Sequence, residues 1–360
     1  MLWTLLVLLP DRLSLLPRAC EAISDWDATI AEADREGVLG LLSWGLREVG
    51  WRLPTTADAW VRQRMLAVAM QQLQARATLK KVTEALEEAG IRCAPFKGPM
   101  LAETYYPPGA LRPCGDLDIL IDPSNRVRAE EVLRGRGYSV EEPSNWGRFE
   151  RFRHEVQACK AGEFGVELHQ NVNSSFGVPV RTAPFLDRAT PTSTSVGVLR
   201  MLSLPDALMA VALHATASQF LRAKWLMDVK MICAAATDSQ IRQAQSVAKE
   251  HRVESAVVFA LREAERRGAT VAPIVDRWRI RHGLARKLRP AVAAALARGA
   301  LSPMPIVHLM LSDELAVWPA AMVFRVWNHV GRRKGWGSQK AKGKGQRAKA
   351  RSEASTNRNG

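Results

Sequence analysis

The sequence predicts an α+β protein in which a small mixed sheet is flanked by an N-terminal and a C-terminal helical module. Apolar residues recur at helical spacings over residues 1–89, and again from about 204 to 330. Between these regions, short apolar runs are separated by glycine and proline turns, which is typical of strands. We therefore divide the chain into an N-terminal helical region at 1–89, an α/β core at 90–180, a C-terminal helical module at 181–330 and a tail at 331–360.

The composition is that of an ordinary folded protein. The chain has 360 residues, of which 47% are hydrophobic and 24% charged, enough for two or three domains. Its five cysteines are scattered and form no CxxC pair, which argues against a disulfide framework or a zinc site and predicts a cytoplasmic location. The apolar start, MLWTLLVLLP, lacks a basic segment before it, so we expect a core helix rather than a secretion signal. No longer apolar run occurs, and no membrane span is predicted.

The positive charge is concentrated at the C-terminus. The net charge is +15, and residues 331–360 carry ten Lys or Arg and one Glu. This segment has almost no apolar residues and is predicted to be disordered. It could bind RNA or another polyanion, but a solvated extension without a specific target is the favoured interpretation. Nucleic acid is therefore a possible partner that the sequence does not favour.

The N-terminal region reads as helices with clear ends. One helical stretch begins at the candidate caps Ser24 and Asp25 and runs to Gly50. A long helix is then expected from about 56 to 88, with Gly90 as its C-terminal stop. These helices carry apolar stripes and no evident chemistry.

The central segment changes pattern and contains the polar motifs. A short strand, IRCAPF, is followed by Gly98 at a turn and a helix. The stretch DLDILID reads as a strand with Asp or Leu120 on one face and the other apolar residues on the opposite face. A helix capped by Ser124 follows, and then two strands form a hairpin around Ala161 and Gly162.

Asp116 and Asp118 are hard to explain in an ordinary strand. Strands deplete Asp, and two carboxylates that point the same way repel each other unless a cation lies between them. Glu167, in the strand FGVELHQ, also stands between apolar residues. If the two strands are neighbours, the three carboxylates converge into a site for divalent cations, with two Mg²⁺ ions expected. The alternative for the paired aspartates alone is a solvated sheet edge.

A phosphate-binding role is predicted for the residues that begin the helix after the first strand. Lys97 supplies a positive charge, and Gly98 opens a helix N-terminus, which favours anions. Arg112, four residues before Asp116, could also reach a phosphate. Each feature alone is weak, but the order of strand, Lys-Gly, helix, Asp-x-Asp strand and Glu-x-His strand is specific.

The stretch from KGPMLAETYY through LRPCGDLDILI and RAEEVLRGRGY to VELHQ resembles the uncharacterised nucleotidyltransferase family of bacteria, a branch of the DNA polymerase beta-like superfamily. The likeness covers roughly residues 20–260. It implies that Asp116 and Asp118 bind metal, that Glu167 is a third metal ligand or the base, and that Gly98 is the phosphate-loop glycine. The superfamily usually has Gly-Ser at that point, whereas this chain has Pro99. The interval from Gly98 to the first aspartate is also longer than usual.

Three further candidates come from residues near these motifs. His169 shares the predicted face of Glu167 and is assigned to nucleotide or acceptor binding, although a structural histidine is equally compatible with the sequence. Lys224, in the C-terminal module, is assigned to phosphate binding. Asp228 lies in an apolar helix, so we expect it to pair with a neighbour such as Lys224 or Arg222 rather than to take part in catalysis.

The leading functional hypothesis is a metal-dependent nucleotidyltransferase. It would transfer a nucleoside monophosphate from an NTP to a hydroxyl of a small molecule or protein, and would release pyrophosphate. One alternative is a nucleotidyltransferase-fold scaffold with weakened catalysis, which the missing serine favours. The other is an RNA-directed enzyme. The sequence identifies neither the acceptor nor the oligomeric state.

Overall fold

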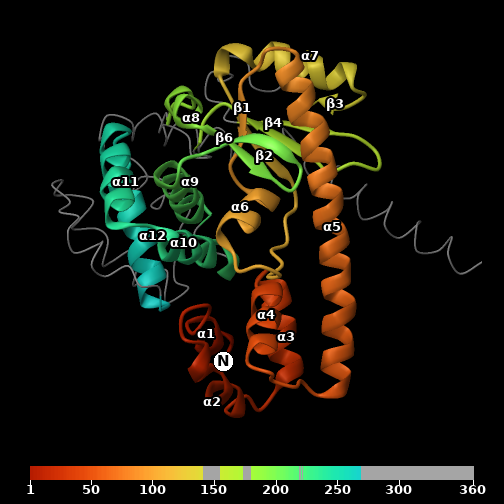
Figure 1. The fold of residues 1–360 in the computed structure, drawn as a ribbon, viewed down its shortest axis with the longest axis vertical. Coiled ribbons are helices and arrows are strands. Elements are labelled where there is room, and N and C mark those ends of the chain that lie inside the picture. The colour runs from red at the N-terminus through yellow and green to blue at the C-terminus, as the bar shows by residue number, and fades with distance from the viewer. Residues whose placement is uncertain (141–154, 173–179, 219, 221, 269–360) are drawn as a thin grey trace, which may run out of the picture.

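The computed structural model describes residues 1–140, 155–172, 180–218, 220 and 222–268. Within them, a five-stranded sheet has the order β1-β2-β5-β4-β3. Figure 1 shows helices around this sheet: α5 runs along one side of the molecule, and α9 to α12 lie on the other. The predicted mixed α/β architecture, with helices before and after the sheet, is confirmed.

The sheet is mixed because its two central strands are parallel. β2 (Leu117–Ile121) pairs in parallel with β5 (Val166–His169). The remaining pairs are antiparallel: β1 (Cys93–Pro95) with β2, β5 with β4 (Glu155–Cys159), and β4 with β3 (Ser139–Val140). β4 and β5 form the predicted hairpin. β2 is distant from β5 in the chain, so these two strands pair only when the chain folds.

Each face of the sheet contacts a separate hydrophobic core. Leu117, Ile119 and Ile121 face a core that includes residues of α5 (Thr55–Glu88) and α7 (Arg126–Gly135). Leu120 faces the other core, which includes Phe96 and Leu101. The predicted alternation of β2 is therefore confirmed, and the face that carries Asp118 is the face covered by the C-terminal helices.

The N-terminal region is helical, as predicted, but its helices begin and end at other residues than expected. α1 (Leu2–Leu6) is short, and η1 (Leu13–Leu15) and α2 (Leu16–Glu21) follow. The stretch predicted from Ser24 to Gly50 forms two helices, α3 (Trp26–Arg35) and α4 (Leu39–Glu48). Asp25 is the cap of α3, because its carboxylate accepts a hydrogen bond from the Ala28 amide. Gly37, at φ +74°, allows the chain to turn between the two helices.

The remaining elements include a helix after β1, a second hairpin, and the C-terminal helices. α6 (Gly98–Tyr105) follows β1, and α8 (Ala183–Arg188) precedes a separate hairpin of β6 (Thr190–Thr194) and β7 (Gly197–Met201). The C-terminal helices are α9 (Leu204–Ala217), α10 (Ala223–Ala235), α11 (Asp238–Glu250) and α12 (Glu254–Arg266). The predicted helix at 124–138 begins with a 3-10 turn, η2 (Pro123–Asn125), which Asp122 rather than Ser124 caps.

Two expectations lie outside the described residues: the helices predicted between 269 and 330, and the basic tail at 331–360. In the part of the chain that the structure describes, no helix combines the length and apolarity needed to cross a lipid bilayer.

Candidate active site

The site is built on the two parallel strands at the centre of the sheet. Asp118 of β2 and Glu167 of β5 are direct partners in the strand register. Directly opposite residues on neighbouring strands project to the same face with their side chains close together. The expectation that these two acidic residues meet on adjacent strands is therefore confirmed.

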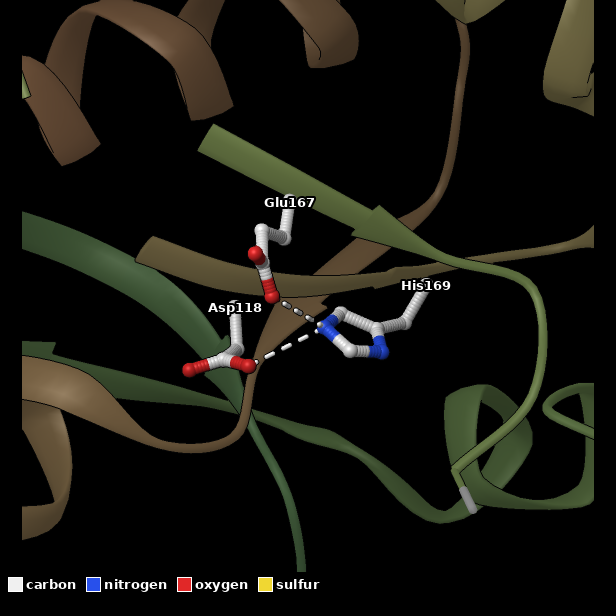
Figure 2. Close-up of side chains that lie close together, drawn as sticks. All are labelled: Asp118, Glu167 and His169. Atoms are coloured by element: carbon white, nitrogen blue, oxygen red, sulfur yellow. Dashed lines mark ion pairs between the residues drawn. The ribbon is translucent and has the colours of Figure 1, made fainter. Parts of the chain in front are cut away.

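His169 joins the two carboxylates, as Figure 2 shows. Its Nε2 lies 3.0 Å from Asp118 Oδ1 and 3.7 Å from Glu167 Oε2. Only 2% of His169 is exposed, and the edge of its ring meets the Phe96 ring at a centroid distance of 5.0 Å. The imidazole is therefore held in one place between the two acidic residues.

Lys97 is the second cation on Asp118. Its Nζ lies 2.6 Å from Asp118 Oδ1 and 3.5 Å from Nδ1 of His214 on α9. Burial alone would lower the pKa of Lys97, but the neighbouring Asp118 carboxylate outweighs burial and raises it. Burial and this ammonium lower the pKa of His214 well below its usual range, so His214 is neutral. Lys97 is thus a charged group that connects the sheet to a C-terminal helix.

The pKa values of Asp118 and His169 are shifted in opposite directions. Burial disfavours ionised Asp118, yet Lys97 and His169 together lower its pKa, so it is a carboxylate. Burial also disfavours charged His169, but hydrogen bonds to Asp118 and Glu167 raise its pKa to about 9. The site therefore contains two internal cations, Lys97 and His169, that offset the charge of its acidic residues.

Asp116 lies immediately before β2, in the loop that leads into the strand. Its pKa is raised to about 6, first by burial and then by the Asp118 and Glu167 carboxylates, while Lys97 and Lys224 oppose the shift. These mutual effects place the Asp116 carboxylate within electrostatic reach of the other two acidic residues. A cation placed among them would remove the repulsion that raises this pKa.

The N-terminus of α6 lies beside these acidic residues. Gly98 has φ +68°, a conformation that side chains with a Cβ rarely adopt. The amide of Phe96 donates to the Asp118 carbonyl at 3.3 Å, so the start of α6 and β2 are held together. Gly98 therefore lets the chain turn sharply from β1 into a helix whose free amides lie near Asp116 and Asp118.

The donor groups fit a divalent cation. One ligand atom each from Asp118, Glu167 and His169 lie within 4.8 Å of one another. Two carboxylates with an imidazole suit Mn²⁺ or another first-row metal, and carboxylates alone suit Mg²⁺. The predicted metal set was Asp116, Asp118 and Glu167. The cluster in the described residues contains His169 in place of Asp116, and the metal-binding role of Asp116 stays a prediction.

The two remaining predicted residues have different surroundings. Lys224 is half-buried at the start of α10, and burial and Arg112 lower its pKa. Arg112 is 4% exposed, and its guanidinium makes two bonds to the Asp228 carboxylate. Asp228 thus has a structural partner, as expected, but the partner is Arg112 rather than Lys224 or Arg222. A phosphate contact by Arg112 stays a prediction, with its charge already engaged.

One polar contact in the site was missed from the sequence. The amide of Gln157 on β4 donates to Glu167 Oε1 at 2.9 Å. The two residues are direct partners across the β4–β5 hairpin. The predicted turn at Ala161 and Gly162 could have indicated this contact, because the position of a hairpin turn determines which residues of the two strands face each other.

The comparison with protein-family models assigns this mixed sheet, with its acidic residues on adjacent central strands beside a helix that begins at a glycine, to the nucleotidyltransferases. The family model for uncharacterised nucleotidyltransferases matches residues 23–268. The chain therefore belongs to this family, and it is a nucleotidyltransferase. No curated protein sequence gives a significant match to it.

Solved nucleotidyltransferase structures resemble this chain distantly. The antibiotic-resistance factor ANT(2'')-Ia is 12% identical, with a TM-score of 0.36, over 53% of this chain and 96% of its own. A nucleotidyltransferase-like protein from Paracoccidioides brasiliensis is 14% identical, with a TM-score of 0.37, over 56% and 92%. A tRNA nucleotidyltransferase is 14% identical, with a TM-score of 0.19, over 64% and 74%.

Proposed function

We propose that the protein uses a divalent metal, Mg²⁺ in the cell, to transfer a nucleoside monophosphate from an NTP to an acceptor hydroxyl. The observation that carries this proposal is the register pairing of Asp118 with Glu167, with His169 and Lys97 both on the Asp118 carboxylate. A buried group of acidic residues and cations at a helix N-terminus suits a triphosphate and its metal ions.

The proposed reaction forms a bond between the acceptor oxygen and the α-phosphorus. It breaks the bond from that phosphorus to the bridging oxygen of the pyrophosphate, which leaves with the electron pair. Asp118, Glu167 and Asp116 would hold two metal ions, which activate the acceptor oxygen and stabilise the pyrophosphate. Glu167, with 19% of its side chain exposed against 7% for Asp118, would take the acceptor proton, and Gln157 orients its carboxylate.

Lys97 and Gly98 form the proposed triphosphate site. The Lys97 ammonium lies where a cation would contact Asp118. With Asp118 holding a metal, Lys97 would be available to contact phosphate oxygens next to the amides at the start of α6. Lys224, which acts electrostatically on Asp116, would contact the same phosphates from α10. His169 would orient Asp118 and Glu167.

The acceptor is proposed to be a small molecule or a protein, in the cytoplasm. The five free cysteines support this part of the proposal, because disulfides are rare in the cytoplasm. The acceptor can be found by incubating the protein with labelled NTPs and a cell extract and identifying which molecule gains label.

The central test replaces Asp118 by Asn. We expect the rate of Mg²⁺-dependent transfer to fall by about a thousandfold or more in this variant. The substitution removes the charge of a proposed metal ligand that is also the partner of Lys97 and His169. Asp122→Asn is the matched control, since Asp122 follows the same strand and its carboxylate accepts from Ser124 instead. Full activity in Asp118→Asn would exclude the proposed mechanism. A wild-type protein that binds neither ATP nor GTP with Mg²⁺, by calorimetry, would favour the scaffold alternative.

A further inference from the structure

The loop between α6 and β2, residues 106–116, ends in Asp116 and is attached to the C-terminal helices by a buried ionic cluster. Arg112 donates from Nε to Asp228 Oδ1 at 2.6 Å and from Nη2 to Oδ2 at 2.7 Å. The Tyr106 hydroxyl donates to the same Oδ1 at 2.6 Å. Tyr106 at the start of the loop and Arg112 in its second half thus converge on one carboxylate of α10, and we call Tyr106, Arg112 and Asp228 the loop clamp.

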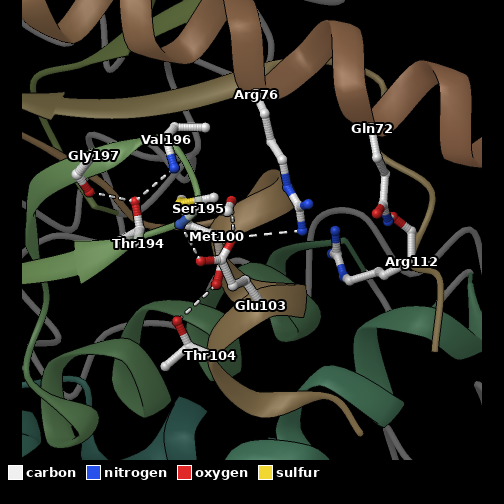
Figure 3. A network of polar contacts seen from close by, with 10 residues as sticks. All are labelled: Gln72, Arg76, Met100, Glu103, Thr104, Arg112, Thr194, Ser195, Val196 and Gly197. Atoms are coloured by element: carbon white, nitrogen blue, oxygen red, sulfur yellow. Dashed lines mark hydrogen bonds and ion pairs between the residues drawn. The ribbon is translucent and has the colours of Figure 1, made fainter. Parts of the chain in front are cut away.

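The loop backbone is also held by N-terminal helices. Gln72 on α5 donates to the Arg112 carbonyl at 2.8 Å, and Figure 3 shows Gln72 and Arg112 together below α5. Gly40 on α4 lies so close to the Leu111 carbonyl that an added Cβ would stand 2.0 Å from its oxygen. The path of the chain four residues before Asp116 is therefore fixed from α4, α5 and α10.

The clamp also relates Asp116 to Lys224. Lys224 and Asp228 are four residues apart on α10 and lie on the same face of that helix. Arg112 and Asp116 both act electrostatically on Lys224. The clamp therefore joins the loop that ends in Asp116 to the helix that carries Lys224.

The burial of the clamp argues against direct contact with a substrate. Tyr106, Arg112 and Asp228 are 8%, 4% and 2% exposed. The Arg112 guanidinium makes two hydrogen bonds to the Asp228 carboxylate, and withdrawing it toward a phosphate would leave Asp228 without its guanidinium partner. Such a separation is strongly unfavourable.

We propose that Tyr106, Arg112 and Asp228 are positioning residues that hold Asp116, and with it Lys224, in the geometry that binds metal and phosphate. The attachment of the loop to α10 rests on the hydrogen bonds alone. The expected effect on metal and phosphate binding rests on the proposed function. The proposed role of Arg112, exerted through the loop, replaces the phosphate contact predicted for it.

The test compares two Arg–Asp pairs, each with a buried carboxylate, in the full-length protein. Asp228→Asn weakens the clamp, and Asp206→Asn is the matched control, because Asp206 is fully buried and accepts three hydrogen bonds from Arg188 outside the loop. Mn²⁺ binding without nucleotide is measured by calorimetry on folded samples of both variants. We expect about tenfold weaker binding for Asp228→Asn, as for other outer-shell partners of metal ligands, and a change below about twofold for Asp206→Asn. Equal Mn²⁺ affinities in the two variants would overturn the proposal.

Tyr106→Phe provides a milder variant in case Asp228→Asn does not fold. Amide hydrogen exchange over residues 107–116 is measured in both variants and in Asp206→Asn. We expect faster exchange over this loop only when the clamp is altered, and unchanged exchange in Tyr106→Phe and Asp228→Asn would overturn the proposal. If the wild-type protein binds no Mn²⁺, the proposed function fails, and the exchange result still decides whether the clamp fixes the loop.

Discussion

Asp118 is the residue on which most of the local chemistry depends. It is a nearly buried carboxylate on a central strand, and it accepts from Lys97 and from His169 at one oxygen. An isolated buried carboxylate would be protonated or strongly destabilising. The two cations keep it ionised, so the site is preformed before a metal arrives.

Lys97→Met tests whether this lysine competes with the metal. We expect Mn²⁺ affinity without nucleotide to rise about tenfold, because the metal no longer has to displace an ammonium from Asp118. ATP affinity should fall, because a phosphate ligand is lost. Calorimetry measures both quantities, and Lys81→Met is the control, since Lys81 pairs with Glu163 near the protein surface. Weaker Mn²⁺ binding in Lys97→Met would show that the lysine does not compete.

Lys230 gives the protein a pH-dependent stability that is separate from the active site. Its Nζ donates to the Val7 carbonyl at 2.9 Å, and burial lowers its pKa to about 8. The folded state therefore binds fewer protons than the unfolded state between pH 8 and about 10.5, so stability from this residue increases as pH rises through that window. Below pH 8 the cost of burying the charge is constant.

We expect the free energy of unfolding of the wild-type protein to increase by roughly 3 kcal/mol relative to that of Lys230→Met between pH 7 and about pH 10.5. Urea unfolding of both proteins at several pH values measures the difference, in which the titration of other groups cancels. A difference that does not change with pH would contradict the lowered pKa.

Among the elements, α6 depends most on a single residue. Its first residue, Gly98, needs a positive φ, and the helix places its N-terminus next to the acidic strand. The sequence predicted this turn correctly, because a glycine followed by proline between a strand and a helix has few other conformations.

Gly98→Ala should reduce both stability and nucleotide affinity. The positive φ costs an alanine about 1–2 kcal/mol, and a shift of the first turn would move the proposed phosphate-binding amides. Gly135→Ala is the control, because Gly135 ends α7 with open space around it and no positive φ. Urea unfolding and ATP titration measure the two effects. Normal ATP binding in a destabilised Gly98→Ala would remove the turn from the proposed nucleotide site.

At the scale of the whole molecule, the N-terminal and C-terminal helices share one hydrophobic core. Leu5 of α1 and Leu208 of α9 are both fully buried in it. The boundaries predicted at 89 and 180 follow changes of sequence pattern, and they stay a prediction about domains. Packing across those boundaries joins residues that are about two hundred positions apart.

Leu5→Ala and Leu208→Ala should therefore destabilise the same unfolding transition. We expect each to cost about 2–5 kcal/mol, and circular dichroism and tryptophan fluorescence to give coincident transitions in both variants. Separate transitions, with each variant affecting only one, would show that the two helical regions unfold independently.

The sequence by itself determined the succession of helices, central sheet and helices, the alternation of β2 and the acidic residues proposed for the candidate site, but it missed β3 and the β6–β7 hairpin within the predicted C-terminal helical module. These depend on local rules: apolar spacing, turn residues, and the cost of placing Asp in a buried strand. Asp118 and Glu167 were identified because each breaks the expected pattern of its own strand. The same local rules identified Gly98 and Lys97.

Only the tertiary structure decided which residues meet. The pairing of Asp228 with Arg112 instead of its helix neighbours, the place of His169 between two carboxylates, and the contact of Lys97 with His214 all join segments distant in the chain. Side-chain partners of this kind are set by strand register and helix packing, which bury a charge and determine the neighbours with which it can pair. Sequence spacing constrains partners only within a turn or a hairpin, and beyond that distance the fold selects them.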